Sequence, residues 1–293
     1  MDKWVLVTGA RGFVGSHVAQ KLSSRGFKVV GLIREVSCAN ETILSGCVAW
    51  ATLDDLTAFL DRKTLFAVVH LATNYGSSGD LCDVLESNVQ MPLKLLDHCI
   101  RSSCNIFVSA DTFFGKKQFN YSHMAPYIYS KNDFANWAKI FCEIHPKIKI
   151  SNLRLEHVYG VGDGPQKFIP DLISRLSINQ PVIQLTKGDQ LRDFLYVEDA
   201  AEAFATILEK HEQLPLGFTE YEVGTGTAIS IREVTETLRN LIGSESKLAF
   251  GALSHRNNEI MISKALPGML ATFGWRASYS LLKGLKRTLC MLK

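Results

Sequence analysis

The 293-residue sequence has no long hydrophobic run and no strong excess of either charge. Since no stretch of about 18 apolar residues occurs, a transmembrane helix is not expected. The short apolar opening at 4–7 runs directly into glycine, so we expect no secretory signal and a soluble, cytoplasmic protein. The net charge of +3 is too small to indicate nucleic-acid binding. We therefore predict neither a nucleic-acid partner nor a membrane partner.

Cysteine and histidine are present, but they lack the spacing of disulfide or metal sites. The seven cysteines are odd in number and include no CxxC pair, which predicts free thiols in a reducing compartment. The eight histidines show no HExxH spacing, so we predict no metal site. The cysteines are Cys38, Cys47, Cys82, Cys99, Cys104, Cys142 and Cys290.

What the sequence does have is the composition of a globular protein, with 46% hydrophobic residues. In its first half, short β-rich runs alternate with amphipathic helical stretches, as in βαβ units. This pattern predicts the α/β class, a Rossmann-type doubly wound parallel sheet with a smaller C-terminal substrate-binding lobe. The expected strands are 4–7, 28–33, 66–71, 105–109 and 148–154.

The alternation becomes irregular near residue 160, where several glycines occur. We expect a Rossmann domain over 1–160 and a mainly substrate-binding lobe over 161–293, with segments near 178–210 returning to the core. Helices are predicted at 13–25 from apolar spacing, and after Ser230, where Ser-Ile-Arg-Glu matches a capping box. The stretch 280–293 predicts a terminal helix docked on the lobe.

A GxxGxxG loop directly follows the first strand and opens the first predicted helix. Glycines in this context let the backbone turn tightly and approach a pyrophosphate at the amide-rich helix end. The loop therefore predicts a dinucleotide cofactor. Its predicted cofactor-binding residues are Gly9, Arg11, Gly12, Phe13, Val14 and Gly15.

The second strand ends in Arg34, where folds specific for NAD usually keep an acidic residue. Arg34 and Arg11 together suit a 2′-phosphate, because guanidinium groups bind phosphates in a bidentate manner. We predict NADP (NADPH) as the cofactor. The alternative is that both arginines are solvated and that Glu35 takes the acidic role. Further cofactor contacts are expected from Asp54 (or Asp55), Leu71, Ala72 and Thr73.

A YxxxK pattern, Tyr127 to Lys131, lies at the start of a predicted helix. Residues four apart share one helix face. A nearby ammonium stabilises a phenolate, so we expect the pKa of Tyr127 to be lowered enough for acid–base catalysis. Behind a GxxGxxG loop, this pair predicts a catalytic tyrosine and lysine.

With these motifs in order, the chain resembles the extended short-chain dehydrogenase/reductases over nearly its whole length. The supporting segments are TGARGFVG, VVHLAT, ESNVQMPLKLL with Asn88, PYIYSK, LRLEHVYG and GDQLRDFLYVEDAAEAF. Within that family it is most similar to bacterial nucleotide-sugar 4-ketoreductases of the CDP-abequose and CDP-paratose synthase type. The segments HLATNYG, RLEHVYGVGDGPQKFIP and TEYEVGTG carry this closer resemblance.

The resemblance implies NADPH-dependent reduction of the 4-keto group of a CDP-3,6-dideoxyhexose, for O-antigen or other surface-polysaccharide sugars. Tyr127 would protonate the carbonyl oxygen while Lys131 holds the nicotinamide ribose. Asn88, Ser109 and His157 would add cofactor contacts, although His157 also lies near the expected substrate. The implied substrate-binding residues are Asp111, Lys167, Arg192 and Arg256. The family also implies a homodimer through helices around 88–104 and 127–145.

One position departs from the family pattern, because Ala110 stands where a serine or threonine usually polarises the substrate carbonyl. Thr112, on the same strand face, is our candidate replacement, and Ser109 is the alternative. Asp111 stands where related dehydratases keep an acid. Arg192 also has a structural alternative, an ion pair with Asp193 or Glu198.

Three functions remain open at this point. The 4-ketoreductase predicts net consumption of NADPH, and dTDP-4-dehydro-6-deoxyglucose is its alternative substrate. A nucleotide-sugar epimerase or dehydratase would recycle tightly bound NAD. A catalytically silent sensor would bind the cofactor without turnover, which the intact tyrosine–lysine pair disfavours.

Overall fold

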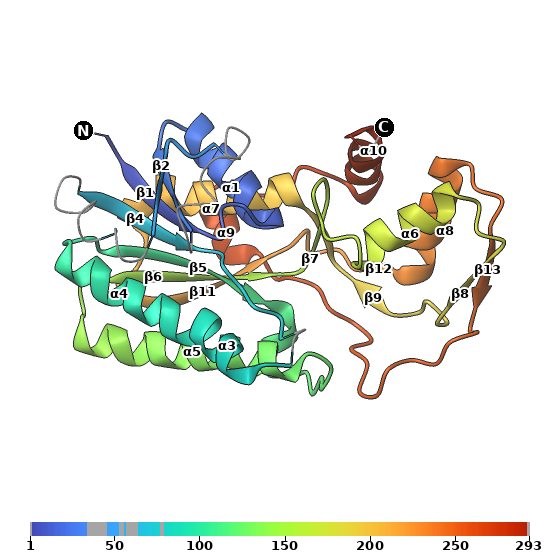
Figure 1. The fold of residues 1–293 in the computed structure, drawn as a ribbon, viewed down its shortest axis with the longest axis horizontal. Helices are drawn as coiled ribbons and strands as arrows, with labels where there is room; N and C mark the ends of the chain where they lie inside the picture. Colours follow the sequence, from blue (N-terminus) through green and yellow to red (C-terminus); the bar gives the residue numbers. More distant parts are fainter. Residues whose placement is uncertain (1, 34–45, 53–55, 57–63, 77–78, 292–293) are drawn as a thin grey trace.

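The computed structural model describes residues 2–33, 46–52, 56, 64–76 and 79–291 (Figure 1). Its centre is a seven-stranded sheet in which every neighbouring pair is parallel. The strand order is β11-β6-β5-β4-β1-β2-β3, so the chain winds outward in both directions from the centre. The strands are β1 (Trp4–Thr8), β2 (Lys28–Leu32), β3 (Ala49–Ala51), β4 (Leu65–His70), β5 (Ile106–Thr112), β6 (Lys149–Leu155) and β11 (Gly217–Val223).

Helices cover both faces of this sheet, which confirms the predicted doubly wound Rossmann class (Figure 1). One apolar cluster joins the sheet to α1 (Phe13–Ser24), α7 (Val197–Glu209) and α9 (Gly268–Thr272). A second cluster joins the other face to α4 (Met91–Arg101) and α5 (Ala125–Ile144). The short helix α3 (Leu81–Leu85) continues into α4 through η2 (Glu86–Gln90), a single π-helical turn.

The predicted strands agree with β1, β2, β4, β5 and β6 to within a few residues. Helix α1 ends at Ser24, one residue short of the prediction, and Gly26 follows with a φ of 85°. The largest difference is in β5, which runs three residues beyond the predicted end. Residues 110–112 therefore belong to a strand, and its regular alternation fixes the face of each side chain.

The smaller lobe lies beyond the carboxyl ends of the core strands and has its own apolar cluster (Figure 1). Ser230 begins α8 by accepting a hydrogen bond from the Glu233 backbone N–H at 3.1 Å, as the predicted cap requires. Helix α10 (Leu281–Met291) docks on the lobe and on β10 (Phe194–Tyr196). The lobe elements are α6 (Phe168–Ser177), β8 (Val182–Leu185), β9 (Leu191–Arg192), β12 (Ile229–Ser230), α8 (Ile231–Ile242), β13 (Lys247–Phe250) and α10 (Leu281–Met291).

The chain crosses between core and lobe several times after residue 160. Strand β7 (His157–Tyr159) pairs with β10 (Phe194–Tyr196), and η4 (His211–Gln213) follows α7. The returning elements are α7, which packs on α1, and β11, which forms the sheet edge. Residues 182–192, which we expected to return with 178–210, pair instead within the lobe. Helix α7 thus lies inside the 178–210 segment expected to return, while β8 and β9 of the same segment stay with the lobe.

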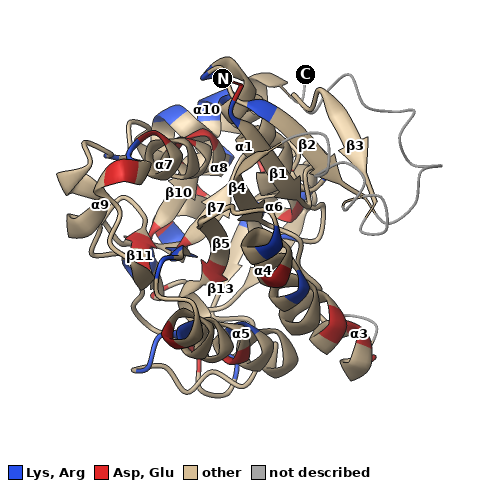
Figure 2. Ribbon diagram, turned by 90° about the vertical axis from the view of Figure 1, so that its left-hand side faces the viewer, with Lys and Arg blue, Asp and Glu red and all other residues tan. Residues whose placement is uncertain are grey.

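Lys and Arg are interspersed with Asp and Glu along α4 and α5, as Figure 2 shows, whereas the charged residues of α7 are all acidic. Ion pairs connect some of these elements, for example Arg25 at the end of α1 with Glu202 and Glu209 on α7. In the described part of the chain, no helix is both long and apolar enough to span a membrane.

Candidate active site

The glycine loop between β1 and α1 is built for close approach of another group. Gly9 has a φ of 64°, which L side chains rarely adopt, and its carbonyl accepts the Gly12 N–H at 2.8 Å. A Cβ at Gly15 would overlap the Gly9 carbonyl oxygen. Helix α1 begins at Phe13 without a side-chain cap, so its first amides are left for a ligand. This cradle fits the pyrophosphate of a dinucleotide.

The end of β4 is tied to the start of this loop through Thr8. The Thr8 hydroxyl accepts the backbone N–H groups of Leu71 and Ala72, both at 3.0 Å. It lies 2.9 Å from Nδ1 of buried His70, and because both amides donate to Thr8, its proton points to that nitrogen. The backbone at 71–73 is therefore held beside Gly9, where the sequence predicted cofactor contacts.

The structure describes some of the other predicted cofactor residues but not all of them. Arg11 is exposed in the glycine loop, and Val14 packs partly into the core beneath it. Phe13 packs against the lobe cluster. Arg34 and Asp54 lie outside the described residues, so their predicted contacts stay predictions.

Tyr127 and Lys131 project from the first turns of α5, below the carboxyl end of β5. Both side chains are buried, and Lys131 Nζ donates to the Ala110 carbonyl at 3.0 Å. Thr112 hydrogen-bonds Tyr127 and also accepts the Phe114 N–H at 3.3 Å. The structure thus brings the predicted catalytic residues Tyr127, Lys131 and Thr112 together at one site.

The pKa of Tyr127 differs from the lowered value that the sequence led us to expect. Burial, with a smaller contribution from Tyr75, raises the pKa of Tyr127 well above its usual value, whereas a hydrogen bond from Thr112 lowers it. Burial also lowers the pKa of Lys131 to about 8, against the opposing effect of Asp111. Lys131 donates its hydrogen bond to the Ala110 carbonyl and not to the Tyr127 hydroxyl, so it does not stabilise the phenolate. Tyr127 therefore remains protonated near neutral pH. That protonation state suits a general acid.

We predict that Thr112→Val moves the alkaline limb of the pH–rate profile to higher pH. Loss of the donor to the phenolate removes the one contact that lowers the pKa of Tyr127. Turnover should also fall roughly tenfold, the worth of one hydrogen bond to a charged group. Rate measurements across pH test this. A Thr112→Ser enzyme, which keeps the hydroxyl, is the control, and an unshifted profile in Thr112→Val would remove Thr112 from the site.

The other polar residues of β5 are engaged with β6. The Ser109 hydroxyl donates to Asn152 Oδ1 at 2.7 Å. Asp111 accepts Asn152 Nδ2 at 2.9 Å and pairs with Arg154 at 3.2 Å. We had considered cofactor contact or carbonyl polarisation for Ser109, and substrate binding for Asp111. In the structure, both side chains are buried and bonded to the neighbouring strand.

Asn88, another predicted cofactor residue, acts as a clamp between three elements. Its Oδ1 accepts the Asn74 N–H, while its Nδ2 donates to the Asn74 carbonyl and to Ser130 Oγ, all at 2.8–2.9 Å. Ser130 Oγ in turn donates to the Tyr127 carbonyl at 3.0 Å. Asn88 thus fixes the loop after β4 relative to the catalytic helix.

Each cationic side chain predicted to bind substrate contacts another side chain of the protein. Arg192 forms an ion pair with Glu259 at 2.6 Å, which differs from the partners Asp193 and Glu198 that we considered. The other contacts are Arg256 with the Tyr121 hydroxyl at 3.0 Å, and Lys167 Nζ 4.1 Å from the Tyr75 ring centroid.

Asp193 and His157 take roles that follow from their burial. Asp193 accepts hydrogen bonds from the N–H groups of Thr225, Gly226 and Ala265. Its carboxylate therefore holds two loops in place and does not pair with Arg192. Burial, with Arg192 and Lys167 adding to it, lowers the pKa of His157 to about 3, so its ring stays neutral. Its Nδ1 is buried with no hydrogen-bond partner among the described residues.

Sequence reasoning missed three residues that line the site, namely Tyr75, Tyr121 and Glu259. Tyr75 follows the end of β4 by five residues, and an aromatic side chain at the carboxyl end of a parallel strand is a usable signal. Glu259 lies three residues after Arg256, but nothing in the sequence connects it with Arg192, 67 residues away. Such pairs are set by tertiary packing.

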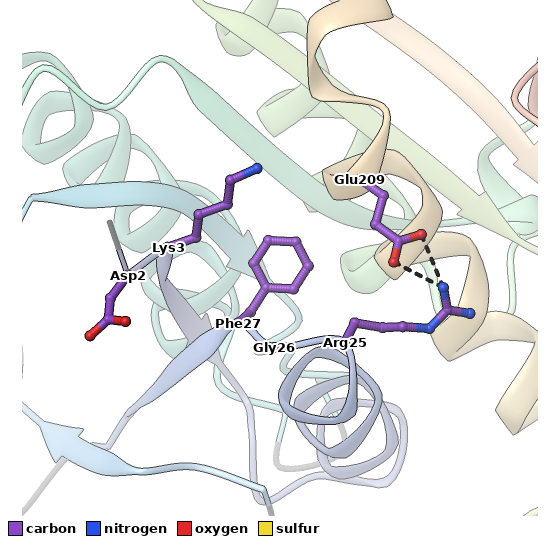
Figure 3. Close-up of a pocket in the computed structure, with 6 residues that line it drawn as sticks. All are labelled: Asp2, Lys3, Arg25, Gly26, Phe27 and Glu209. Carbon is purple, nitrogen blue, oxygen red and sulfur yellow. Dashed lines mark hydrogen bonds and ion pairs between the residues drawn. The ribbon is translucent and has the colours of Figure 1, made fainter.

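A hollow of about 340 Å³ elsewhere on the molecule does not meet these residues (Figure 3). It lies at the amino ends of β1 and β2, where the Arg25–Glu209 ion pair closes one side. Ligands of parallel α/β sheets bind at the carboxyl ends of the strands. Over the described ranges, His, Cys, Asp and Glu nowhere gather in threes suited to a metal ion.

The geometry agrees with comparisons to known proteins. The model of the NAD dependent epimerase/dehydratase family matches residues 5–224. The chain belongs to this family. It is 39% identical to the CDP-abequose synthase of Salmonella typhimurium (strain LT2) over 99% of this chain and 98% of that protein. The CDP-abequose synthase of Salmonella muenchen is 36% identical over the same shares.

A solved structure also shares this architecture. The UDP-glucose 4-epimerase of Thermus thermophilus, in complex with NAD, aligns with a TM-score of 0.76 at 25% identity, covering 98% of each chain. These findings confirm the resemblance to the extended short-chain dehydrogenase/reductases. The chain is therefore a nicotinamide-dependent enzyme of that family.

Proposed function

We propose that this enzyme uses NADPH to reduce the 4-keto group of a CDP-4-dehydro-3,6-dideoxyglucose. The observation that carries this proposal is the protonated Tyr127 beside Lys131, between the glycine loop and a lobe that presents Arg192 and Arg256. The full-length similarity to two CDP-abequose synthases supports the choice of a deoxysugar with a CDP carrier.

The residues on the core side fit a nicotinamide dinucleotide. The amides after Gly12 would bind its pyrophosphate, and Lys131 would hold the nicotinamide ribose once it leaves the Ala110 carbonyl. When bound, NADPH supplies hydride. Tyr127 supplies the proton to the carbonyl oxygen and is returned to its neutral form from water.

The lobe side fits the anionic half of a nucleotide sugar. Arg192 is buried and its charge is already oriented by Glu259, so it can bind a diphosphate without first being ordered. Arg256, which is bonded to Tyr121, and Lys167, which lies over the ring of Tyr75, would add two further cations. Neutral His157 lies beside them as an uncharged hydrogen-bonding group.

The contacts of Asp111 count against a dehydratase. A dehydratase needs a carboxyl group free to protonate its leaving group, whereas Asp111 is bonded to Asn152 and Arg154 on β6. An epimerase that recycles NAD would show no net loss of NADPH.

A panel assay tests the proposal directly. The enzyme is incubated with NADPH and the CDP-, dTDP-, UDP- and GDP-linked 4-keto-6-deoxy sugars, and loss of NADPH absorbance is followed. We expect turnover with the CDP-linked 3,6-dideoxy sugar. Preference for the dTDP-linked sugar would change the nucleotide assignment, and absence of turnover with every sugar would refute the reductase proposal.

If the enzyme prefers NADP to NAD, Arg34→Asp should weaken the binding of NADPH at least about 10-fold more than the binding of NADH. The reason is that a negative charge then faces the 2′-phosphate. One lost charge-assisted contact is worth about 1.5–3 kcal/mol. Fluorescence titration with both cofactors measures this. Equal losses for NADPH and NADH would show that Arg34 does not face the phosphate.

We further propose that the enzyme is a cytoplasmic homodimer in surface-polysaccharide sugar synthesis. Helix α5 exposes Trp137, Ile140 and Ile144 at helical spacing on its outer side, and the exposed fraction of Ile144 is 66%. This stripe supports a contact through the helices predicted to form the dimer. Sedimentation equilibrium distinguishes the dimer from a monomer.

A further inference from the structure

Reduction of a carbonyl places negative charge on its oxygen, and a second donor beside the general acid stabilises that charge. The position where the family keeps this donor is Ala110, whose side chain has no hydroxyl. The nearby hydroxyls of β5 are engaged elsewhere, Ser109 with Asn152 and Thr112 with Tyr127. The second donor must therefore come from another element.

Tyr75, in the loop after β4, packs against the ring of the proposed general acid. Its ring centroid is 4.9 Å from that of Tyr127, with 49° between the ring planes. Lys167 also contacts Tyr75, with its Nζ 4.1 Å from the centroid of the Tyr75 ring. Tyr75 is 44% exposed, so part of the ring still faces open space. Tyr75 thus stands between the general acid of the core and a cation of the lobe.

The backbone that carries Tyr75 is held on both sides. Asn74 is bonded through its N–H and its carbonyl to the side chain of Asn88, and its own Oδ1 accepts the Gly76 N–H at 2.9 Å. Asn88 is linked through Ser130 to the Tyr127 carbonyl. Two tyrosines from different elements are therefore fixed relative to each other, as a catalytic pair requires.

We propose that Tyr75 is a second catalytic residue, which donates a hydrogen bond to the C4 carbonyl oxygen of the sugar while Tyr127 protonates that oxygen. The inference rests on the proposed reductase function. The C4=O π bond breaks as C4 accepts hydride from NADPH, and the oxygen takes its proton from Tyr127. Tyr75 keeps its proton throughout, so the products are the alcohol, NADP⁺ and a Tyr127 phenolate that water reprotonates.

The surroundings of Tyr75 suit a donor that does not ionise. Partial burial, together with the Asp163 carboxylate, raises the pKa of Tyr75, so its hydroxyl stays protonated at neutral pH. The ammonium of Lys167 over the ring face holds the ring by a cation–π contact. The same contact draws electron density from the ring and strengthens the hydroxyl as a donor.

The test is Tyr75→Phe, which removes the hydroxyl and keeps the ring that contacts Tyr127 and Lys167. We expect kcat to fall about 10²-fold, as for loss of one donor to a developing oxyanion, with KM for the sugar and NADPH affinity within about twofold of wild type. Tyr129→Phe is the matched control, since Tyr129 lies two residues from Tyr127 but is exposed, and it should leave kcat unchanged.

A second measurement follows the polarisation of the C4 carbonyl in a complex that does not turn over. The infrared band of an isotopically labelled C4 carbonyl is recorded with the sugar bound to the enzyme and NADP⁺. Loss of one donor weakens polarisation, so we expect the band to move to higher frequency in Tyr75→Phe and to stay in place in Tyr129→Phe.

The outcomes separate the two proposals. Turnover in wild type with an unchanged kcat and an unmoved band in Tyr75→Phe would overturn the role of Tyr75 alone. A higher KM with unchanged kcat would make Tyr75 a binding residue and would equally overturn its catalytic role. No NADPH consumption by the wild-type enzyme with any 4-keto sugar would refute the reductase function and the role of Tyr75 with it.

Discussion

Tyr127→Phe is expected to lower turnover by about 10²–10⁴-fold, the usual contribution of a general acid. The substitution removes only the hydroxyl, while the buried ring keeps its contacts with the neighbouring apolar side chains. The substitution leaves Lys131 in place for its proposed contact with the nicotinamide ribose, so the cofactor side of the site is unaltered. NADPH affinity should therefore stay near that of wild type, which fluorescence titration measures.

The pH dependence gives this prediction a second readout. Because burial raises the pKa of Tyr127, the acid form is present through neutral pH, and activity in the direction of reduction should fall when alkaline pH removes its proton. In Tyr127→Phe, any residual activity should lack this alkaline limb. Turnover equal to that of wild type would show that another group protonates the oxygen.

The sequence predicted those parts of the fold that depend on local patterns. The GxxGxxG loop, the strands around it and the Ser230 cap each lie within a few consecutive residues, and the structure places all of them close to prediction. Tyr127 and Lys131 are equally local, since one turn of helix brings them together. Such signals survive because the interactions behind them join neighbours in the chain.

Contacts between distant segments could not be predicted in this way. Arg192 is paired with Glu259, and Lys116 forms a buried ion pair with Glu156 at 2.7 Å, yet neither partner is marked by spacing or composition. The pKa of Tyr127 depends on burial, which a motif does not reveal.

The cofactor loop provides the second large effect. Gly15→Ala adds one methyl group where the Gly9 carbonyl oxygen already stands, with the Ala10 Cα close behind. Both neighbours are backbone atoms of the loop itself, so the clash can be relieved only by moving the loop or the start of α1. Overpacking of this kind typically costs about 1–3 kcal/mol.

We expect Gly15→Ala to weaken NADPH binding by at least about 10-fold and to lower the free energy of unfolding by about 1–3 kcal/mol. The reason is that the displaced backbone carries the same amides that would bind the pyrophosphate. Gly268→Ala is the matched control, since nothing lies within 4 Å of the added methyl and α9 begins there. It should leave the cofactor affinity unchanged and stability equal or slightly higher. Cofactor titration and urea unfolding measure both effects, and a Gly15→Ala enzyme with wild-type NADPH affinity would show that the pyrophosphate does not occupy the glycine loop.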